Sequence, residues 1–269
     1  MVPLSTTMDT PGPLARTVAD VAYAFAAFDP AGHHAPAFLD RLSRVELSGV
    51  RIGMCESFMW DDLDPGIGQA VKRALDEASR KGARLVKLDF PEMREAYEMH
   101  LKGSVLSVEL KQFLDDVLPA WKETLEPIIQ RRVADGGAID ATEYIRRLRW
   151  CAAKNKAANA RLAEVDVIAM PTSPLSPPRL ADVSNVDGYV AHNRKSFRFT
   201  CGVNLLALCA LSMPVGLNKH GLPVGLQLVS RSGNEERLLE VAFALERAIG
   251  TGADRMGQPP LNKALKRGS

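Results

Sequence analysis

Two hydroxyl side chains, Thr172 and Ser173, directly follow a short apolar run that ends at Pro171. Proline has no N–H to donate to a strand ladder, so the chain must leave a sheet at this point and open a loop. Loops at the ends of buried strands often hold ligands, and a few polar groups usually orient the ligand there. We therefore expect Thr172 and Ser173 to line a substrate pocket.

Asn204 is the third candidate for binding, because it lies near the end of a helical pattern that runs from Ala191 to Leu206. Its side-chain amide offers both a donor and an acceptor to a polar substrate. The alternative interpretation is structural, since asparagine side chains often cap helices or bridge loops. The sequence leaves both interpretations open.

No complete catalytic constellation is visible. Nucleophilic hydrolysis needs a nucleophile, a base that takes its proton, and donors that hold the oxyanion. The sequence has no adjacent pair of serines, no G-x-S-x-G elbow, no H-E-x-x-H and no cysteine with a convincing histidine partner. We therefore predict that the catalytic residues are absent from these 269 residues.

Metal and cofactor sites are not expected either. The cysteines have no C-x-x-C spacing, which favours reduced core thiols over disulfides or zinc ligands, and they are Cys55, Cys151, Cys201 and Cys209. His33 and His34 lie in a loop with no further ligand at a suitable spacing. Gly49 and Gly53 lack the third glycine of a dinucleotide-binding fingerprint, so we interpret them as turn and packing glycines.

The apolar pattern predicts a sheet with helices around it. Short apolar runs bounded by proline or glycine indicate buried strands, and we place strands at Val50–Cys55, Ala83–Leu88, Val165–Met170, Leu211–Val215 and Val224–Val229. Amphipathic patterns predict helices at Leu14–Phe28, Pro65–Lys81 and Asn234–Ile249. Strand, helix and strand in succession favour a parallel pair.

The middle of the chain, from Met93 to Glu164, is helical in pattern and is broken near Pro119, Pro127 and Gly136 with Gly137. It is also locally basic, with Arg131, Arg132, Arg146, Arg147 and Arg149. Such residues usually form a solvated helix face, and nearby acidic residues dilute their charge. Binding of an anion is the alternative.

The charge balance argues against nucleic acid as a partner. The 34 basic and 32 acidic side chains are mixed along the sequence, so no broad basic face is expected. No apolar run reaches the length of a membrane span, and no signal peptide is evident at the N-terminus. We therefore expect a cytoplasmic protein that does not bind a membrane.

Three motifs in order resemble the C-terminal half of the amidase signature family. They are Asp166 with Pro171 and Thr172, then Asn204 with Pro214 and Gly216, then the run from Gly221 to Gln227. Asp9, Arg16 and Asp20 match residues that follow the catalytic signature of that family, and we interpret them as an ion-pair and capping set. Two positions depart from the pattern, since Ala207 replaces the usual glycine and Cys209 the usual proline.

This resemblance implies an α/β fold with a mixed, largely parallel sheet flanked by helices. It implies that residues 1–250 are the C-terminal part of a single amidase domain, and we expect a disordered tail at 251–269. The family hydrolyses carboxamide C–N bonds with a serine, a second serine and a lysine, none of which can be placed here. The whole enzyme would then act on a small amide.

The resemblance leaves two interpretations of the chain itself. In the first, it is the truncated C-terminal portion of an amidase; in the second, it is a catalytically inactive remnant that serves as a binding or assembly module. An uncovered sheet edge and apolar face would invite either a separate N-terminal half or a second copy of this chain.

Overall fold

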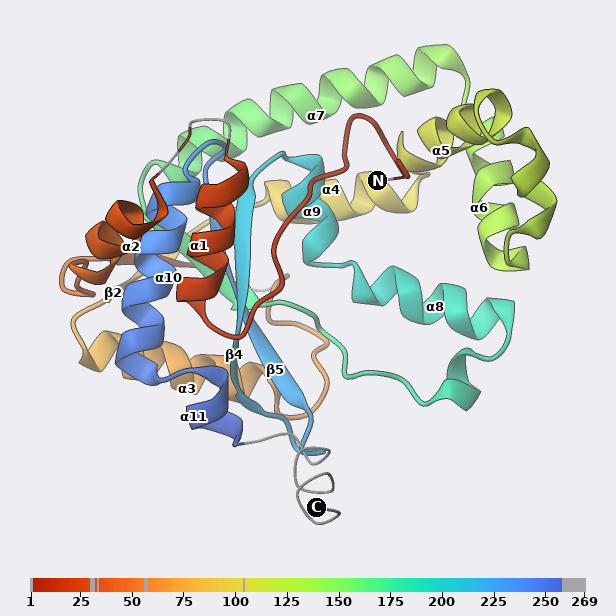
Figure 1. The fold of residues 1–269 in the computed structure, drawn as a ribbon. Helices are drawn as coiled ribbons and strands as arrows, with labels where there is room; N and C mark the ends of the chain where they lie inside the picture. The colour runs from red at the N-terminus through yellow and green to blue at the C-terminus, as the bar shows by residue number, and fades with distance from the viewer. Residues whose placement is uncertain (1, 30–31, 33, 56–57, 104, 258–269) are drawn as a thin grey trace, which may run out of the picture. The chain divides into compact units, whose positions relative to one another are not determined.

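The computed structural model describes residues 2–29, 32, 34–55, 58–103 and 105–257 (Figure 1). The chain divides into two compact units, each built from several segments. The sheet unit comprises Gly12–Asp89, Leu162–Pro174 and Cys209–Ser269. The helical unit comprises Met1–Pro11, Phe90–Arg161 and Leu175–Leu208. His33 of the predicted histidine loop lies outside the described residues.

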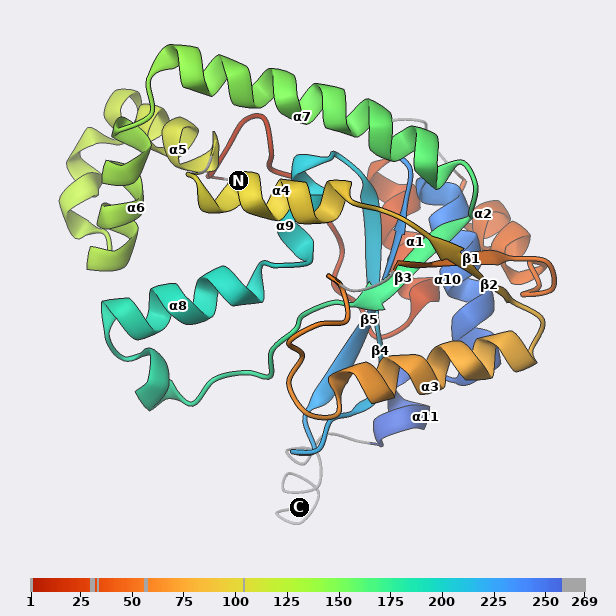
Figure 2. The ribbon, with the colours of Figure 1, turned by 180° about the vertical axis from the view of Figure 1, so that it is seen from behind.

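The sheet unit contains a mixed sheet with the strand order β2-β1-β3-β5-β4, which confirms the predicted α/β class (Figure 2). Its strands are β1 (Arg51–Cys55), β2 (Arg84–Leu88), β3 (Val167–Pro171), β4 (Cys209–Leu217) and β5 (Pro223–Ser230). The β1 strand pairs in parallel with β2 and with β3, whereas β5 pairs antiparallel with β3 and with β4. The β2-β1-β3 side of the sheet is thus parallel, and the β3-β5-β4 side is antiparallel.

Apolar side chains from alternate strand positions make one face of the sheet, and the helices α3 (Ile67–Arg80) and α10 (Glu235–Ile249) pack on it. The strand residues of this core include Ile52, Val167, Ala169, Leu226 and Leu228. The helices α1 (Val18–Phe28) and α2 (Ala35–Ser43) lie beside α10 (Figure 1). Because successive side chains of a strand point to opposite faces, the residues between these core positions lie on the other face of the sheet.

The start of α1 explains part of the motif that precedes it. The Thr17 hydroxyl accepts a hydrogen bond from the backbone N–H of Asp20 at 3.1 Å and donates to its carboxylate at 2.8 Å. The Asp9 carboxylate accepts from the backbone N–H of Leu4 at 2.8 Å in the helical unit. Thr17 is therefore the residue that caps α1, and the two aspartates accept local hydrogen bonds instead of forming the predicted ion-pair and capping set. Arg16 is exposed, and no carboxylate in the described part of the chain pairs with it.

A short helix, α11 (Gly252–Met256), lies within the range where we expected a disordered tail. A capping box explains it, because Thr251 and Asp254 each bind the backbone N–H of the other. The Arg255 guanidinium then donates to the Glu77 carboxylate at 2.8 Å and to the carbonyl of Val215 at 2.8 Å. Local capping and tertiary hydrogen bonds therefore order this segment as far as the structure describes it.

The helical unit contains most of the predicted breaks in the expected places. Its elements are α4 (Glu92–Leu101), α5 (Val105–Asp116), η1 (Pro119–Thr124), α6 (Pro127–Gly137), α7 (Ala141–Leu162), η2 (Leu180–Val183), α8 (Val186–Ser196) and α9 (Thr200–Leu205). The single helix predicted at Ala191–Leu206 was wrong, because it is two helices with a break around Phe199. The Phe199 ring is fully buried at this break, and we attribute the interruption of the helix to the packing of this ring.

A buried carboxylate holds the N-terminal segment against two helices of the helical unit. Glu109 of α5 accepts hydrogen bonds from the hydroxyl of Ser5 at 2.5 Å, from the backbone N–H of Thr7 at 3.0 Å and from the hydroxyl of Tyr144 at 2.6 Å. The Thr7 hydroxyl donates to it as well. Burial alone raises the pKa of Glu109, but these hydrogen bonds outweigh it and lower the pKa from 4.5 to about 2.

None of the four cysteines forms a disulfide in the structure. Burial raises the pKa of Cys201 to about 12 and that of Cys209 to about 11, so both thiols are protonated at neutral pH. Among the described helices, none combines the length and the apolar character that crossing a bilayer requires.

Candidate functional site

Thr172 and Ser173 lie at the end of β3 in the sheet unit, where the sequence predicts them. The sheet continues through Thr172, because its backbone N–H donates to the carbonyl of Gly225 at 2.9 Å. Its hydroxyl oxygen lies 2.6 Å from that of Ser212, so one of the two donates to the other. Thr172 and Ser173 are both half-buried, whereas Ser212 is exposed. The structure thus pairs Thr172 with a hydroxyl that the sequence analysis did not single out.

Gly225 makes this pair of hydroxyls possible. A Cβ added at Gly225 would lie 2.6 Å from the Thr172 hydroxyl oxygen and 2.9 Å from that of Ser212, which is closer than real contacts allow. The glycine in the run from Gly221 to Gln227 therefore has a physical reason, since it leaves room on the sheet for two polar groups from neighbouring strands. Ser212 could have been found from the sequence only with the strand register.

Gln227 adds a third polar side chain to the same face of the sheet. It pairs across the strands with Met170 and with Ser212, two positions from Gly225 along β5. Gln227 is 4% exposed, and its amide nitrogen has no hydrogen-bond partner among the described residues. Buried donors without a partner are rare and call for an explanation. The three polar side chains lie on the face of the sheet opposite the core helices, and they are those of Thr172, Ser212 and Gln227.

Asp166 fixes the start of β3 relative to its neighbours. Its carboxylate accepts from the backbone N–H of Arg51 at 2.7 Å and from the guanidinium of Arg237 at 3.1 Å. Its carbonyl accepts from the Ser230 hydroxyl at 2.9 Å. One aspartate therefore ties together β1, β5 and α10, which explains its place in the motif and positions the strand that carries Thr172.

Asn204 lies in the helical unit, so the structure assigns it to a different unit from Thr172 and Ser173. Its amide nitrogen donates to the carbonyl of Met8 at 2.7 Å, which is a loop-bridging contact. The carbonyl of Asn204 accepts from the backbone N–H of Ala207 at 2.9 Å, and Ala207 has a φ of 48°. A left-handed conformation is the reason that glycine is favoured at this position.

The basic helices are resolved into residues with different roles. Arg147 is 6% exposed and donates to the Glu143 carboxylate at 2.8 Å and to the carbonyls of Lys102 and Gly103. It therefore holds the turn between α4 and α5, rather than forming part of a solvated helix face. Arg146 is exposed and paired with Glu143.

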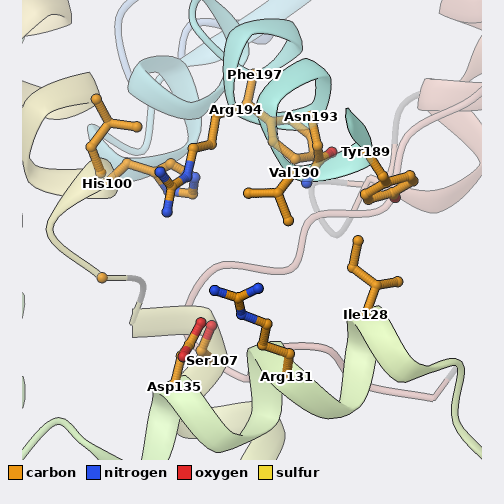
Figure 3. Close-up of a pocket in the computed structure, with 12 residues that line it drawn as sticks. His100, Ser107, Ile128, Arg131, Asp135, Tyr189, Val190, Asn193, Arg194 and Phe197 are labelled. Carbon is orange, nitrogen blue, oxygen red and sulfur yellow. The ribbon is translucent and has the colours of Figure 1, made fainter. Parts of the chain in front are cut away.

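Arg131 lies on a pocket within the helical unit. The pocket has a volume of about 140 Å³ and is formed by α4, α5, α6 and α8 (Figure 3). Figure 3 shows Arg131 of α6 on one wall, with Arg194 and His100 on the wall formed by α8 and α4. Asp135 lies beside Arg131, and Ile128 and Tyr189 lie at the other end of the pocket.

The polar groups described here offer hydrogen-bond donors and acceptors to a ligand. The hydroxyl pair has no histidine, lysine or carboxylate base within hydrogen-bond distance among the described residues. No cluster of metal-ligand side chains occurs in the described part of the chain. Nucleophilic catalysis would need an activating base beside the nucleophile.

Comparison with known proteins gives a consistent family. The family model described as Amidase matches residues 1–239. The 2-amino-5-chloromuconic acid deaminase of Comamonas testosteroni is 40% identical over 265 residues, which cover 97% of this chain and 56% of that protein. The indoleacetamide hydrolase of Agrobacterium vitis is 30% identical over 271 residues, which cover 93% of this chain and 56% of that protein.

A solved structure gives the same fold. The native peptide amidase of Stenotrophomonas maltophilia superposes with a TM-score of 0.70 at 24% identity, over 93% of this chain and 56% of that one. The chain thus spans about half the length of the relatives it matches. The order of its motifs, the mixed sheet that they build and the family match over residues 1–239 agree, and we conclude that this chain belongs to the amidase family.

Proposed function

We propose that this chain forms the C-terminal part of a hydrolase that acts on carboxamide C–N bonds. The observation that carries the proposal is the family match over residues 1–239, combined with coverage of 56% of its 40% identical relative. The nucleophilic serine, the second serine and the lysine are then supplied by residues outside these 269. The sequence supports this division, since it has no adjacent serine pair.

In this proposal Thr172 and Ser173 form part of the substrate wall, together with the hydroxyl of Ser212. The hydroxyl pair supplies a donor and an acceptor at a strand end, which a substrate amide can meet with its carbonyl and its N–H groups. Asn204, in the helical unit, is proposed separately as a binding residue through its side-chain oxygen, because its amide nitrogen already donates to Met8. The partner is a small amide, and the hydrolysis needs no cofactor.

The first experiment measures turnover of a panel of amides by the chain alone and after addition of a separately expressed N-terminal half. One compound that is not an amide, an amino-substituted unsaturated diacid, is assayed beside the panel, because the 40% identical relative is named for such a substrate. We expect no turnover above an empty-vector control for the chain alone, and activity with both halves. Turnover by the chain alone would show that it holds a nucleophile. Inactivity with both halves favours the inactive binding module.

The second experiment tests the substrate wall in the two-part enzyme. Thr172→Val removes the hydroxyl and keeps the side-chain shape, whereas Thr172→Ser keeps the hydroxyl. We expect Thr172→Val to change the ratio of kcat/KM between small and bulky amides, and Thr172→Ser to change it less. If the ratio of kcat/KM between small and bulky amides is the same for the parent and Thr172→Val, Thr172 does not line the substrate pocket.

A further inference from the structure

We propose that the pocket formed by α4, α5, α6 and α8 binds the carboxylate group of a small organic acid. Two guanidinium groups, those of Arg131 and Arg194, line it from different helices (Figure 3). No carboxylate in the described part of the chain forms an ion pair with either of them. Asp135 is the acidic side chain of the lining, so the two arginines leave an excess of positive charge. An anion is the complementary ligand.

Hydrogen bonds from side chains to backbone carbonyls hold the walls of this pocket in place. Buried Arg147 fixes the turn that includes Gly103, through the carbonyls of Lys102 and Gly103. The Tyr97 hydroxyl donates to the backbone carbonyl of Arg194 at 3.3 Å, which joins α4 to α8. These contacts hold the backbone of the walls in place before a ligand arrives, which lowers the entropic cost of binding.

Close packing of α5 and α6 fixes the third wall. A Cβ added at Gly136 would lie 2.1 Å from the carbonyl oxygen of Ser107, so only glycine permits this approach of the two helices. Ser107 is buried and lines the pocket, and Arg131 lies on α6, which ends at Gly137. The glycine pair that the sequence marks as a helix break therefore also positions a wall.

The other residues that line the pocket indicate the size and the apolar character of the rest of the ligand. Ile128, Val190 and Tyr189 form an apolar end of the pocket, which suits a hydrocarbon body (Figure 3). Its volume of about 140 Å³ is well below the roughly 300–1,000 Å³ that drug-sized ligands occupy. A guanidinium binds a carboxylate with two parallel hydrogen bonds, which gives it selectivity over a neutral amide. The ligand is therefore a small acid with an apolar body.

Calorimetric titration of the 269-residue chain tests this inference directly. The probes are benzoate, benzamide, which has the same shape without the charge, and inorganic phosphate. We expect benzoate to bind at least tenfold more tightly than benzamide, which loses the charge-assisted hydrogen bonds, and than phosphate, which has no hydrocarbon body for the apolar end of the pocket. 4-Carbamoylbenzoate identifies the source of the acid: tighter binding than benzoate indicates an acid-bearing amide, and equal binding indicates a free acid.

Variants at three arginines distinguish binding in the pocket from a general effect of charge. Arg131→Gln and Arg194→Gln should each weaken benzoate binding about tenfold or more, and the corresponding lysine variants should weaken it less. Arg149→Gln is the matched control, because Arg149 is exposed on α7 and does not line the pocket. Far-UV circular dichroism confirms that each variant is folded.

Several results would overturn the inference. They are equal binding of benzoate and benzamide, equal binding of benzoate and phosphate, an equal loss of affinity in Arg149→Gln, and the absence of benzoate binding. Because binding is measured without turnover, these results do not depend on the amide hydrolysis proposed above. If the chain binds benzoate but the two-part enzyme is inactive, the inference about the pocket stands and the proposed hydrolase function is refuted.

Discussion

Replacing Glu109 with glutamine removes the charge at the centre of the contacts that hold residues 5–7 in the helical unit. The pKa of Glu109 falls from 4.5 to about 2 in the folded protein, and the residue is only 8% exposed. Each pKa unit corresponds to about 1.4 kcal/mol, so the ionised form contributes about 3 kcal/mol to the free energy of unfolding at neutral pH. We expect Glu109→Gln to lose roughly this amount, because Ser5, Thr7 and Tyr144 then donate to a neutral amide.

The dependence on pH has a definite sign. A carboxylate whose pKa is lowered by folding stabilises the native state above its unfolded pKa of 4.5, and this contribution declines as the pH falls toward about 2. At pH 3 the contribution of Glu109 should be about 1.4 kcal/mol. The difference in unfolding free energy between the parent and Glu109→Gln should therefore narrow by about 2 kcal/mol between pH 7 and pH 3.

Urea unfolding followed by far-UV circular dichroism at pH 7 and pH 3 measures this difference. Glu98→Gln is the control, since Glu98 is an exposed carboxylate on α4 of the same unit, and we expect it to change stability by less than about 0.5 kcal/mol at either pH. A Glu109→Gln protein with the parent's stability at pH 7 would refute the reasoning. So would a loss of stability that is the same at both pH values.

Three further predictions each rest on one local feature of the structure. Gly136→Ala should destabilise the helical unit by about 2 kcal/mol or more in thermal unfolding, because the added methyl group would overlap the Ser107 carbonyl; an unchanged Tm would contradict the packing described. Ala207→Gly should be neutral or stabilising by up to about 1 kcal/mol, because the φ of 48° suits glycine, whereas Ala153→Gly on α7 should destabilise by about 1 kcal/mol. The Cys201 thiol, with its pKa raised by burial to about 12, should resist alkylation by iodoacetamide at pH 8 until the chain is unfolded, and rapid labelling of the native protein would disagree with its burial.

The strands were predictable from the sequence because proline and glycine punctuate short apolar runs. All five predicted strands overlap observed ones, and their order in the chain was right. The parallel pairing of β1 with β2 was predicted from strand, helix and strand in succession and is confirmed, whereas the position of β3 between β1 and β5 is not local information. The resemblance supplied the assembly of the strands into one sheet, and periodicity did not.

The candidate site was predictable in part. Thr172 follows from the strand end at Pro171, but Ser212 and Gln227 depend on strand register, which decides the face of the sheet that each residue occupies. Two local signals in the sequence could have improved the predicted elements. Thr251 with Asp254 forms a capping box, and Asn185 caps α8 by accepting from the backbone N–H of Gly188 at 2.8 Å.

The two units are interleaved along the chain, and this has a consequence for how the protein can change during evolution. Most of the helical unit lies in the connection between β2 and β3 and in that between β3 and β4. Closing a loop as long as residues 89–166 costs only about 2 kcal/mol more than closing a ten-residue crossover. Insertions, deletions and exchanges of helices in these two connections can therefore accumulate without shifting the strand register that Asp166 fixes, so new ligand preferences can arise on an unchanged sheet.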